Sequence, residues 1–212
     1  MERLSCFTHT LQLVIIDGLT EASGLSGTRA KLSRTASLLH SSTSFKDRFE
    51  SCFGDATIPS ANATRWNSTL KQVTFDMQNL SYMLNSEGHK ALILSQRDYA
   101  QLKELIEVLD PFLEATDLTQ GEKTVTASVV VPCVLSLHCH LQEIRGRVRY
   151  CGPLVRALAS SLKTRFTEIF QAVKMPGCEP AEGRGPTKFP FTTAYFIASV
   201  LDPSFWFPVA KT

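Results

Sequence analysis

The sequence predicts a mainly α-helical protein, and three observations lead to this fold class. Apolar residues recur at spacings of three and four over most of the 212-residue chain, which is the period of one helix face. Glycine, proline and serine gather in short stretches between these segments, where they end helices. The β-branched run at residues 129–131, which favours a strand, lies inside a longer helical period.

The composition is typical of a globular chain in a reducing compartment. Hydrophobic residues make up 43% and charged residues 20%, so one domain or one and a half can bury a sizeable core. The formal net charge of +2 excludes a bulk electrostatic attraction to nucleic acid, so such binding would need a local basic patch. The six cysteines are too scattered for a disulfide-stapled secreted domain. No run approaches the roughly 18 apolar residues that would span a membrane.

Three helices are expected in the first quarter of the chain. The apolar residues of segment 9–19 are too dense for a one-faced surface helix, which indicates a largely buried one. Gly24 and Gly27 break it, and an amphipathic helix follows over residues 29–39. Apolar residues at three- and four-residue spacing then predict a short helix over residues 45–53.

Two longer helices are expected in the middle of the chain. Thr64 can cap a helix over residues 65–84, because its hydroxyl accepts from the unpaired amides of the first turn. Residues 86–94 form a break or a short turn of helix. An apolar face then marks a helix over residues 96–113, and Pro111 either kinks it or starts a new turn, because proline has no backbone donor.

The last part of the chain combines two helices with a linker and a tail. Residues 124–144 contain the strand-favouring valine run, but their period and length favour a helix, which we choose. A proline in the first turn suits a helix over residues 153–173. Residues 174–188 are rich in proline and glycine and form a flexible linker. The apolar tail 189–212 contains a helix that ends near Leu201, because a proline follows two positions later.

Four short motifs occur in an order that resembles the hAT-superfamily transposases. They are Cys6-x-x-His9, Thr64-Arg65-Trp66-Asn67-Ser68-Thr69, Leu109-x-Pro111-Phe112 and Leu201-Asp202-Pro203-x-Phe205. Together they cover most of the chain. The sequence resembles in particular the C-terminal transposase part of proteins that carry BED-type zinc fingers, although it contains no BED finger.

The resemblance implies a fold and a domain order. In this family an RNase-H-like core is interrupted by an all-helical insertion domain. We therefore expect a truncated segment of that core, with helices only, over residues 1–85. The helical insertion domain is expected over residues 86–173, followed by the linker 174–188 and an apolar tail helix within residues 189–212.

The resemblance also implies that the chain is not an enzyme. The family's core holds two metal ions on an Asp, Asp, Glu triad, and these ions activate the nucleophile. The strands that carry the two aspartates are expected before residue 6, and the glutamate is expected beyond the insertion. Neither Asp17 nor Asp202 matches a catalytic position. No catalytic residue, small-molecule substrate or cofactor is therefore predicted.

Cys6 and His9 are weak candidates for metal ligands. Their one-turn spacing could supply two zinc ligands, but a complete site needs two more. A second cluster of Cys133, His138, Cys139 and His140 places its histidines on different helix faces. A buried thiol and a core-packed or capping histidine are favoured instead. A Cys–His nucleophile pair lacks an orienting Asn or Asp.

Two groups of residues are candidates for contact with nucleic acid or a partner. Trp66, next to Arg65, can stack on a base, although anchoring its helix to the core is the favoured interpretation. The densest basic cluster consists of Arg145, Arg147, Arg149 and Arg156. Such a cluster could contact phosphates or acidic partners, whereas a solvated loop is the more common meaning.

The resulting hypothesis is a domesticated, catalytically inactive transposase fragment that acts as a protein-interaction or transcription-related module. Family membership implies an intracellular protein, nuclear rather than cytoplasmic. Helices that once packed on the missing sheet would present apolar faces to protein partners, notably residues 11–19. The alternative is a non-specific nucleic-acid-binding protein that uses the arginine cluster. No membrane association is expected. Two further interpretations are a metal-dependent nuclease and a product without function.

Overall fold

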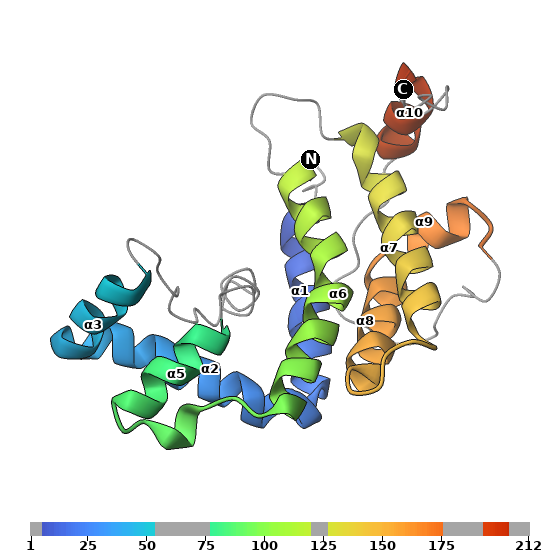
Figure 1. Cartoon of the computed structure of the whole chain (residues 1–212). Coiled ribbons are helices and arrows are strands. Elements are labelled where there is room, and N and C mark those ends of the chain that lie inside the picture. The colour runs from blue at the N-terminus through green and yellow to red at the C-terminus, as the bar shows by residue number, and fades with distance from the viewer. Residues whose placement is uncertain (1–5, 54–76, 120–126, 176–192, 204–212) are drawn as a thin grey trace, which may run out of the picture. The chain divides into compact units, whose positions relative to one another are not determined.

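The computed structural model describes residues 6–53, 77–119, 127–175 and 193–203, and within these ranges every regular element is a helix (Figure 1). This confirms the predicted mainly α fold class. The elements, with η for a 3-10 helix, are α1 (Phe7–Glu21), η1 (Ser23–Leu25), α2 (Ser26–Ser41), α3 (Thr43–Phe53), α5 (Met77–Ser86), η2 (Lys90–Leu92), α6 (Gln96–Thr119), η3 (Ala127–Val129), α7 (Val130–Ile144), α8 (Gly152–Arg165), α9 (Thr167–Ala172) and α10 (Thr193–Leu201).

The chain divides into two compact units. Unit 1 comprises residues 1–21, 110–147 and 153–212, and unit 2 comprises residues 22–109 and 148–152. Helix α6 therefore contributes its first part to unit 2 and its last part to unit 1. The domain boundaries expected from the family resemblance stay a prediction.

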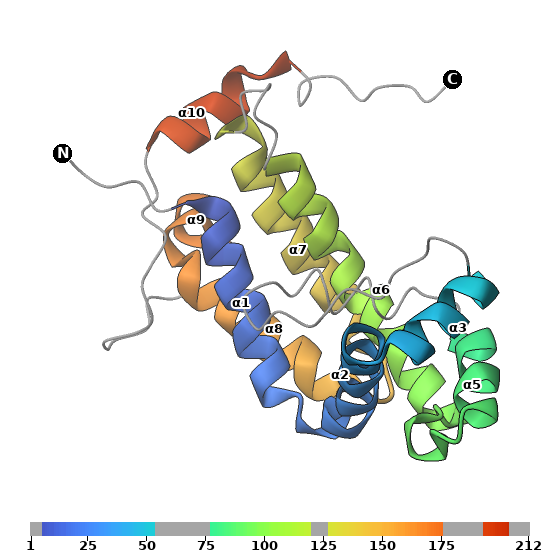
Figure 2. The same cartoon turned by 90° about the vertical axis from the view of Figure 1, so that its left-hand side faces the viewer.

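In unit 1, helix α1 belongs to the core. Several of its apolar side chains are completely buried, namely Leu11, Val14 and Ile15. The ring of Phe7 packs against that of Phe166, with centroids 5.6 Å apart. Figure 2 shows α1 beside α8. The prediction of a largely buried helix is confirmed, whereas the expectation that residues 11–19 leave an open apolar face is wrong, because α8 packs there.

Gly18 allows α8 to lie close to α1. A Cβ at this position would lie 2.5 Å from Leu158 Cδ2 and 3.2 Å from Leu154 Cδ1. Both leucines are fully buried, so neither can turn into solvent. Overpacking of a core costs about 1–3 kcal/mol, and the roughly 1 kcal/mol of helix propensity that alanine gains over glycine offsets part of it. We therefore expect Gly18→Ala to lower the free energy of unfolding by up to about 2 kcal/mol.

Urea denaturation of the full chain measures this change. Gly27, in α2, provides the matched control, since a Cβ there meets no atom within 4 Å. Gly27→Ala should leave the free energy of unfolding unchanged or raise it by up to about 1 kcal/mol. Stabilisation by Gly18→Ala would contradict the close packing of the two helices.

One predicted helix is divided in the structure. A single helix was expected over residues 153–173, but α8 ends at Arg165 and α9 begins at Thr167. The backbone of Phe166 leaves the helical conformation, with φ −107° and ψ 26°, while its side chain is fully buried. Tertiary packing of this ring accompanies the break, and such packing overrides local helix propensity.

The other predicted helices agree in type with the structure where it describes them. The valine run is helical in η3 and α7, α6 continues through Pro111, and α10 ends at Leu201. Of the helix expected over residues 65–84, only the part within α5 is described. Residues 64–76 lie outside the described ranges, as does most of the predicted linker.

Unit 2 has a core of its own, formed by α2, α3, α5 and the first part of α6. Its most deeply buried apolar residues include Leu32, Ala36, Phe45, Phe49, Leu80, Leu84 and Leu105. The ring of Phe45 also meets that of His89 edge-on, with centroids 5.4 Å apart. Apolar burial of this extent is the main stabilising contribution to such a unit.

One described segment is long and apolar enough to cross a membrane. It is the 18-residue stretch Ala127–Ile144, which comprises η3 and α7. This corrects the expectation that no run approaches that length. Core helices of soluble proteins have the same composition, and 44% of this stretch is buried within the protein, so it does not by itself indicate a membrane.

Candidate functional site

Cys6 and His9 lie at the start of α1, and both side chains are exposed. The buried thiol and the core-packed histidine expected there are therefore wrong, because the buried face of α1 is formed by other residues, whereas the capping alternative for the histidine stays a prediction. Within the described ranges, no three Cys, His, Asp or Glu side chains gather closely enough to hold one metal ion. Among the described residues, no third Cys, His, Asp or Glu ligand therefore joins Cys6 and His9.

The second His–Cys cluster lies on α7. His138 is buried, and its ring meets that of Phe170 edge-on, with centroids 5.2 Å apart. Burial, followed by the nearby charge of Lys163, lowers the pKa of His138 and keeps the imidazole neutral at pH 7. In the part of the chain that the structure describes, Nδ1 of His138 and Nε2 of His140 are buried without a hydrogen-bond partner.

The four arginines of the basic cluster are divided between the two units. Arg145, Arg147 and Arg156 belong to unit 1, whereas Arg149 belongs to unit 2. All four side chains are exposed. Arg65 and Trp66, the other predicted contact residues, lie outside the described ranges.

Asp17 has a structural partner on α8. Its Oδ2 accepts from Ser161 Oγ at 2.6 Å and from Arg165 Nε and Nη2 at 3.0 and 2.9 Å. Arg165 is buried, and a buried charge must be paired to be tolerated. The carboxylate of Asp17 therefore ties α1 to α8 within unit 1.

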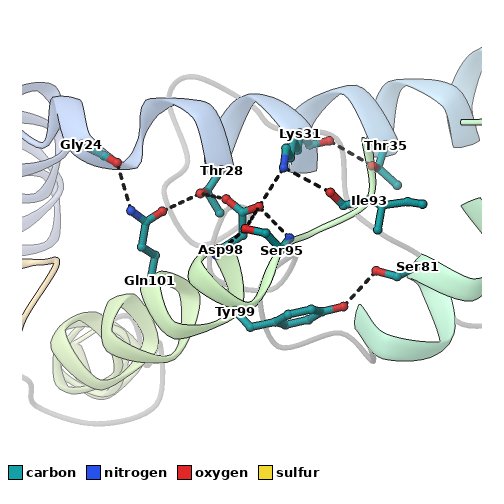
Figure 3. Close-up of polar contacts among 10 residues, drawn as sticks. All are labelled: Gly24, Thr28, Lys31, Thr35, Ser81, Ile93, Ser95, Asp98, Tyr99 and Gln101. Carbon is teal, nitrogen blue, oxygen red and sulfur yellow. Dashed lines mark hydrogen bonds and ion pairs between the residues drawn. The ribbon is translucent and has the colours of Figure 1, made fainter. Parts of the chain in front are cut away.

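Figure 3 shows a polar network around Asp98 in unit 2. Oδ2 of Asp98 accepts from Lys31 Nζ at 2.7 Å and from both the backbone N–H and the hydroxyl of Ser95 at 2.8 Å. The N–H of Asp98 donates to Ser95 Oγ at 3.2 Å, which completes a capping box at the start of α6. The hydroxyl of Thr28 donates to Oδ1 at 2.5 Å.

These contacts determine the ionisation of Asp98. Burial alone would raise the pKa of its carboxyl, but hydrogen bonds from Lys31, Thr28 and Ser95 outweigh burial and hold the pKa well below the usual range. Asp98 is therefore an ionised residue that joins α2 to the start of α6.

A second contact of α6, which the sequence did not predict, is made by Glu104. Its carboxylate accepts from the backbone N–H groups of Arg149, Tyr150 and Cys151 at 2.9, 2.7 and 2.9 Å. Hydrogen bonds to a carboxylate are charge-assisted, so this Glu104 clamp holds residues 149–151 against α6 within unit 2. Contacts between residues 45 apart have no local sequence pattern that could have revealed them.

Cys151 is unreactive because of where the clamp places it. Its side chain is fully buried. Burial, followed by the charge of Glu104, raises the pKa of the thiol to about 12. The thiolate is the nucleophilic form of cysteine, so this residue is a core side chain at neutral pH.

The clamp also places Tyr150 against two arginines. The guanidinium carbons of Arg97 and Arg149 lie 5.7 Å and 5.4 Å from the centroid of its ring, which are cation–π distances. Both arginines are exposed and the tyrosine is half-buried. We call these three residues the Arg97–Tyr150–Arg149 cluster.

Apolar side chains gather on the surface of α10. Ile197 and Leu201 are four residues apart, hence on one helix face, and are 49% and 67% exposed. Phe196 and Val200 on the same helix are also exposed. The other large exposed apolar side chains of the described ranges are Ile16, Tyr82 and Leu118, each on a different helix.

Comparison of the chain with models of known protein families gives no match, and comparison with curated protein sequences gives none either. The family resemblance of the four motifs therefore stays a prediction.

Proposed function

We propose that this chain is a non-catalytic, helical protein-interaction module derived from an hAT-superfamily transposase. The observation that carries the proposal is the pair Ile197 and Leu201, which exposes an apolar strip on α10. Such a strip at i and i+4 suits a hydrophobic groove on a partner protein. A transcription-related role in the nucleus follows from the family resemblance.

The engagement of the carboxylates supports the non-catalytic part of the proposal. Asp17, Asp98 and Glu104 each accept several hydrogen bonds that join separate elements of one unit. Both oxygens of Asp98 and of Glu104, and Oδ2 of Asp17, are thus engaged in structural contacts. General acid–base or metal-assisted chemistry needs carboxylates directed at a substrate instead.

The double substitution Ile197→Glu and Leu201→Glu is expected to abolish partner capture. Two charges on the apolar strip would have to be desolvated on binding, which costs several kcal/mol. The measurement is quantitative mass spectrometry of proteins retained by the tagged chain from nuclear and cytosolic extracts, with nuclease added. Partners should be lost from the double variant by about tenfold or more.

Tyr82→Glu provides the matched control, because Tyr82 is a 79% exposed side chain on α5. This variant should retain the same partners as the wild type. Equal capture by all three proteins would contradict the role of α10. Analytical ultracentrifugation adds a second readout, the oligomeric state. If the partner is a second copy of the chain, the double glutamate variant should be monomeric where the wild type is not.

A second candidate function is sequence-independent binding of nucleic acid. The exposure of Arg145, Arg147, Arg149 and Arg156 favours it. Binding of this kind would weaken steeply with salt, because each phosphate contact releases counterions. Arg147→Ala or Arg149→Ala would then reduce the salt dependence, whereas absent or salt-independent binding would exclude this function.

A further inference from the structure

The Arg97–Tyr150–Arg149 cluster places two positive charges around one aromatic ring of unit 2. Both guanidinium groups lie against the same ring, although their residues are 52 positions apart in the sequence, as their numbers show. Arg97 lies in the first turn of α6. Tyr150 is held by its own N–H, which donates to Glu104 Oε2 at 2.7 Å. The cluster is therefore positioned by secondary structure and by the clamp rather than by the arginines themselves.

The arginines of this cluster keep their hydrogen-bonding capacity. In cation–π stacking a guanidinium places its flat face against the ring, which leaves the N–H groups at its edges available for a planar, bidentate acceptor. Among the described residues, no carboxylate lies within ion-pair distance of either guanidinium. The carboxylate of the clamp, Glu104, is already engaged by three backbone amides.

We propose that the Arg97–Tyr150–Arg149 cluster binds a phosphorylated side chain, phosphoserine or phosphothreonine, of a partner protein. The two guanidinium groups, whose carbons lie 5.7 Å and 5.4 Å from the centroid of the Tyr150 ring, together match the charge of one phosphate ester dianion and its three acceptor oxygens. An extended nucleic-acid backbone would instead require a stripe of positive charge, and the net charge of the chain is only +2. The inference rests on the proposed interaction function and names the chemistry of the partner.

The test uses two fluorescein-labelled peptide libraries that differ only in a fixed central phosphothreonine or threonine. Fluorescence anisotropy with the full chain should show at least about tenfold tighter binding of the phosphorylated library. The double variant Arg97→Ala and Arg149→Ala should lose this preference. Lysine at both positions should restore part of it, because lysine keeps the charge but lacks the bidentate geometry.

Arg34→Ala is the matched control, since Arg34 is an exposed arginine of α2 in the same unit. It should bind the phosphorylated library as the wild type does, and circular dichroism should show equal helix content in all variants. Equal affinity for the two libraries would overturn the proposal. If the chain binds a 20-nucleotide oligothymidylate more tightly than the phosphorylated library, and this binding weakens as the salt concentration rises, the proposal would be overturned in favour of nucleic-acid binding.

The same variants separate this proposal from the proposed function of α10. If the double arginine variant still captures the partners that depend on Ile197 and Leu201, and neither library binds, the phosphate site fails while the interaction function stands. If the phosphorylated library binds but the α10 variant captures every partner, the interaction through α10 fails alone.

Discussion

Asp98→Ala is expected to lower the free energy of unfolding by about 1.5–3 kcal/mol, the range for losing hydrogen bonds to a charged group. The Lys31–Asp98 ion pair is partly buried, with side chains 31% and 12% exposed. The side chain of Asp98 joins Lys31 on α2 to Ser95 at the start of α6. Truncation leaves the Lys31 ammonium and the Thr28 hydroxyl without this acceptor and removes half of the capping box. The loss is measured by urea denaturation, monitored by the helix signal in circular dichroism at about 222 nm.

A surface ion pair supplies the control for this substitution. Lys46 and Glu50 lie 3.5 Å apart on α3, and both side chains are more than half exposed. Glu50→Ala should change the free energy of unfolding by at most about 0.5 kcal/mol, because exposed i,i+4 pairs contribute little. A loss from Asp98→Ala as small as that from Glu50→Ala would show that the Asp98 network does not stabilise unit 2.

The Asp98 carboxylate should also make stability depend on pH. Its pKa in the folded protein lies below that of the unfolded chain, so its contribution is complete above about pH 5 and decreases as the pH falls below the ordinary aspartate pKa of about 3.9. The wild type should therefore lose more stability than Asp98→Ala when acidified from about pH 5 to about pH 2. Parallel curves for the two proteins would contradict the depressed pKa.

Phe166→Ala is expected to destabilise unit 1 by about 3–5 kcal/mol, as other truncations of buried aromatic residues do. The side chain of Phe166 is completely buried at the break between α8 and α9, and its ring packs 5.6 Å from that of Phe7. Alanine would leave a cavity between α1 and these helices. Hydrogen exchange should show reduced protection of amides in α1 and α8.

Two further variants serve as controls for the effect of Phe166→Ala. Phe166→Leu fills most of the volume and should cost less than half as much, whereas Tyr82→Ala, at a 79% exposed position, should cost about 0.5 kcal/mol or less. Amide protection of α2 and α3 in unit 2 should respond to Asp98→Ala more than to Phe166→Ala. Tolerance of Phe166→Ala without loss of stability would mean that α1 does not depend on this contact.

Local patterns in the sequence were sufficient for the class and the approximate limits of the helices. The three- and four-residue apolar spacing, the break near Gly24 and the proline at position 203 act over a few residues, so they could be interpreted directly. The prediction that Gly27 also breaks the helix is wrong, because Gly27 lies within the first turn of α2. The burial of α1 followed from the density of its apolar residues. The same patterns predicted a single helix over residues 153–173, whereas the structure has α8 and α9 with Phe166 between them. The break was not predictable, because burial of the Phe166 ring depends on its contact with α1.

The candidate site was predicted less well, since its residues meet only after folding. The sequence indicates a basic cluster near position 150 but gives no reason to include Arg97. The predicted arginines are also divided between the two units. The Glu104 clamp and the Asp98 network join residues 45 to 70 positions apart. Helix periodicity reports on neighbours within a turn or two, whereas the partner of a charged side chain is chosen by packing between helices distant in sequence.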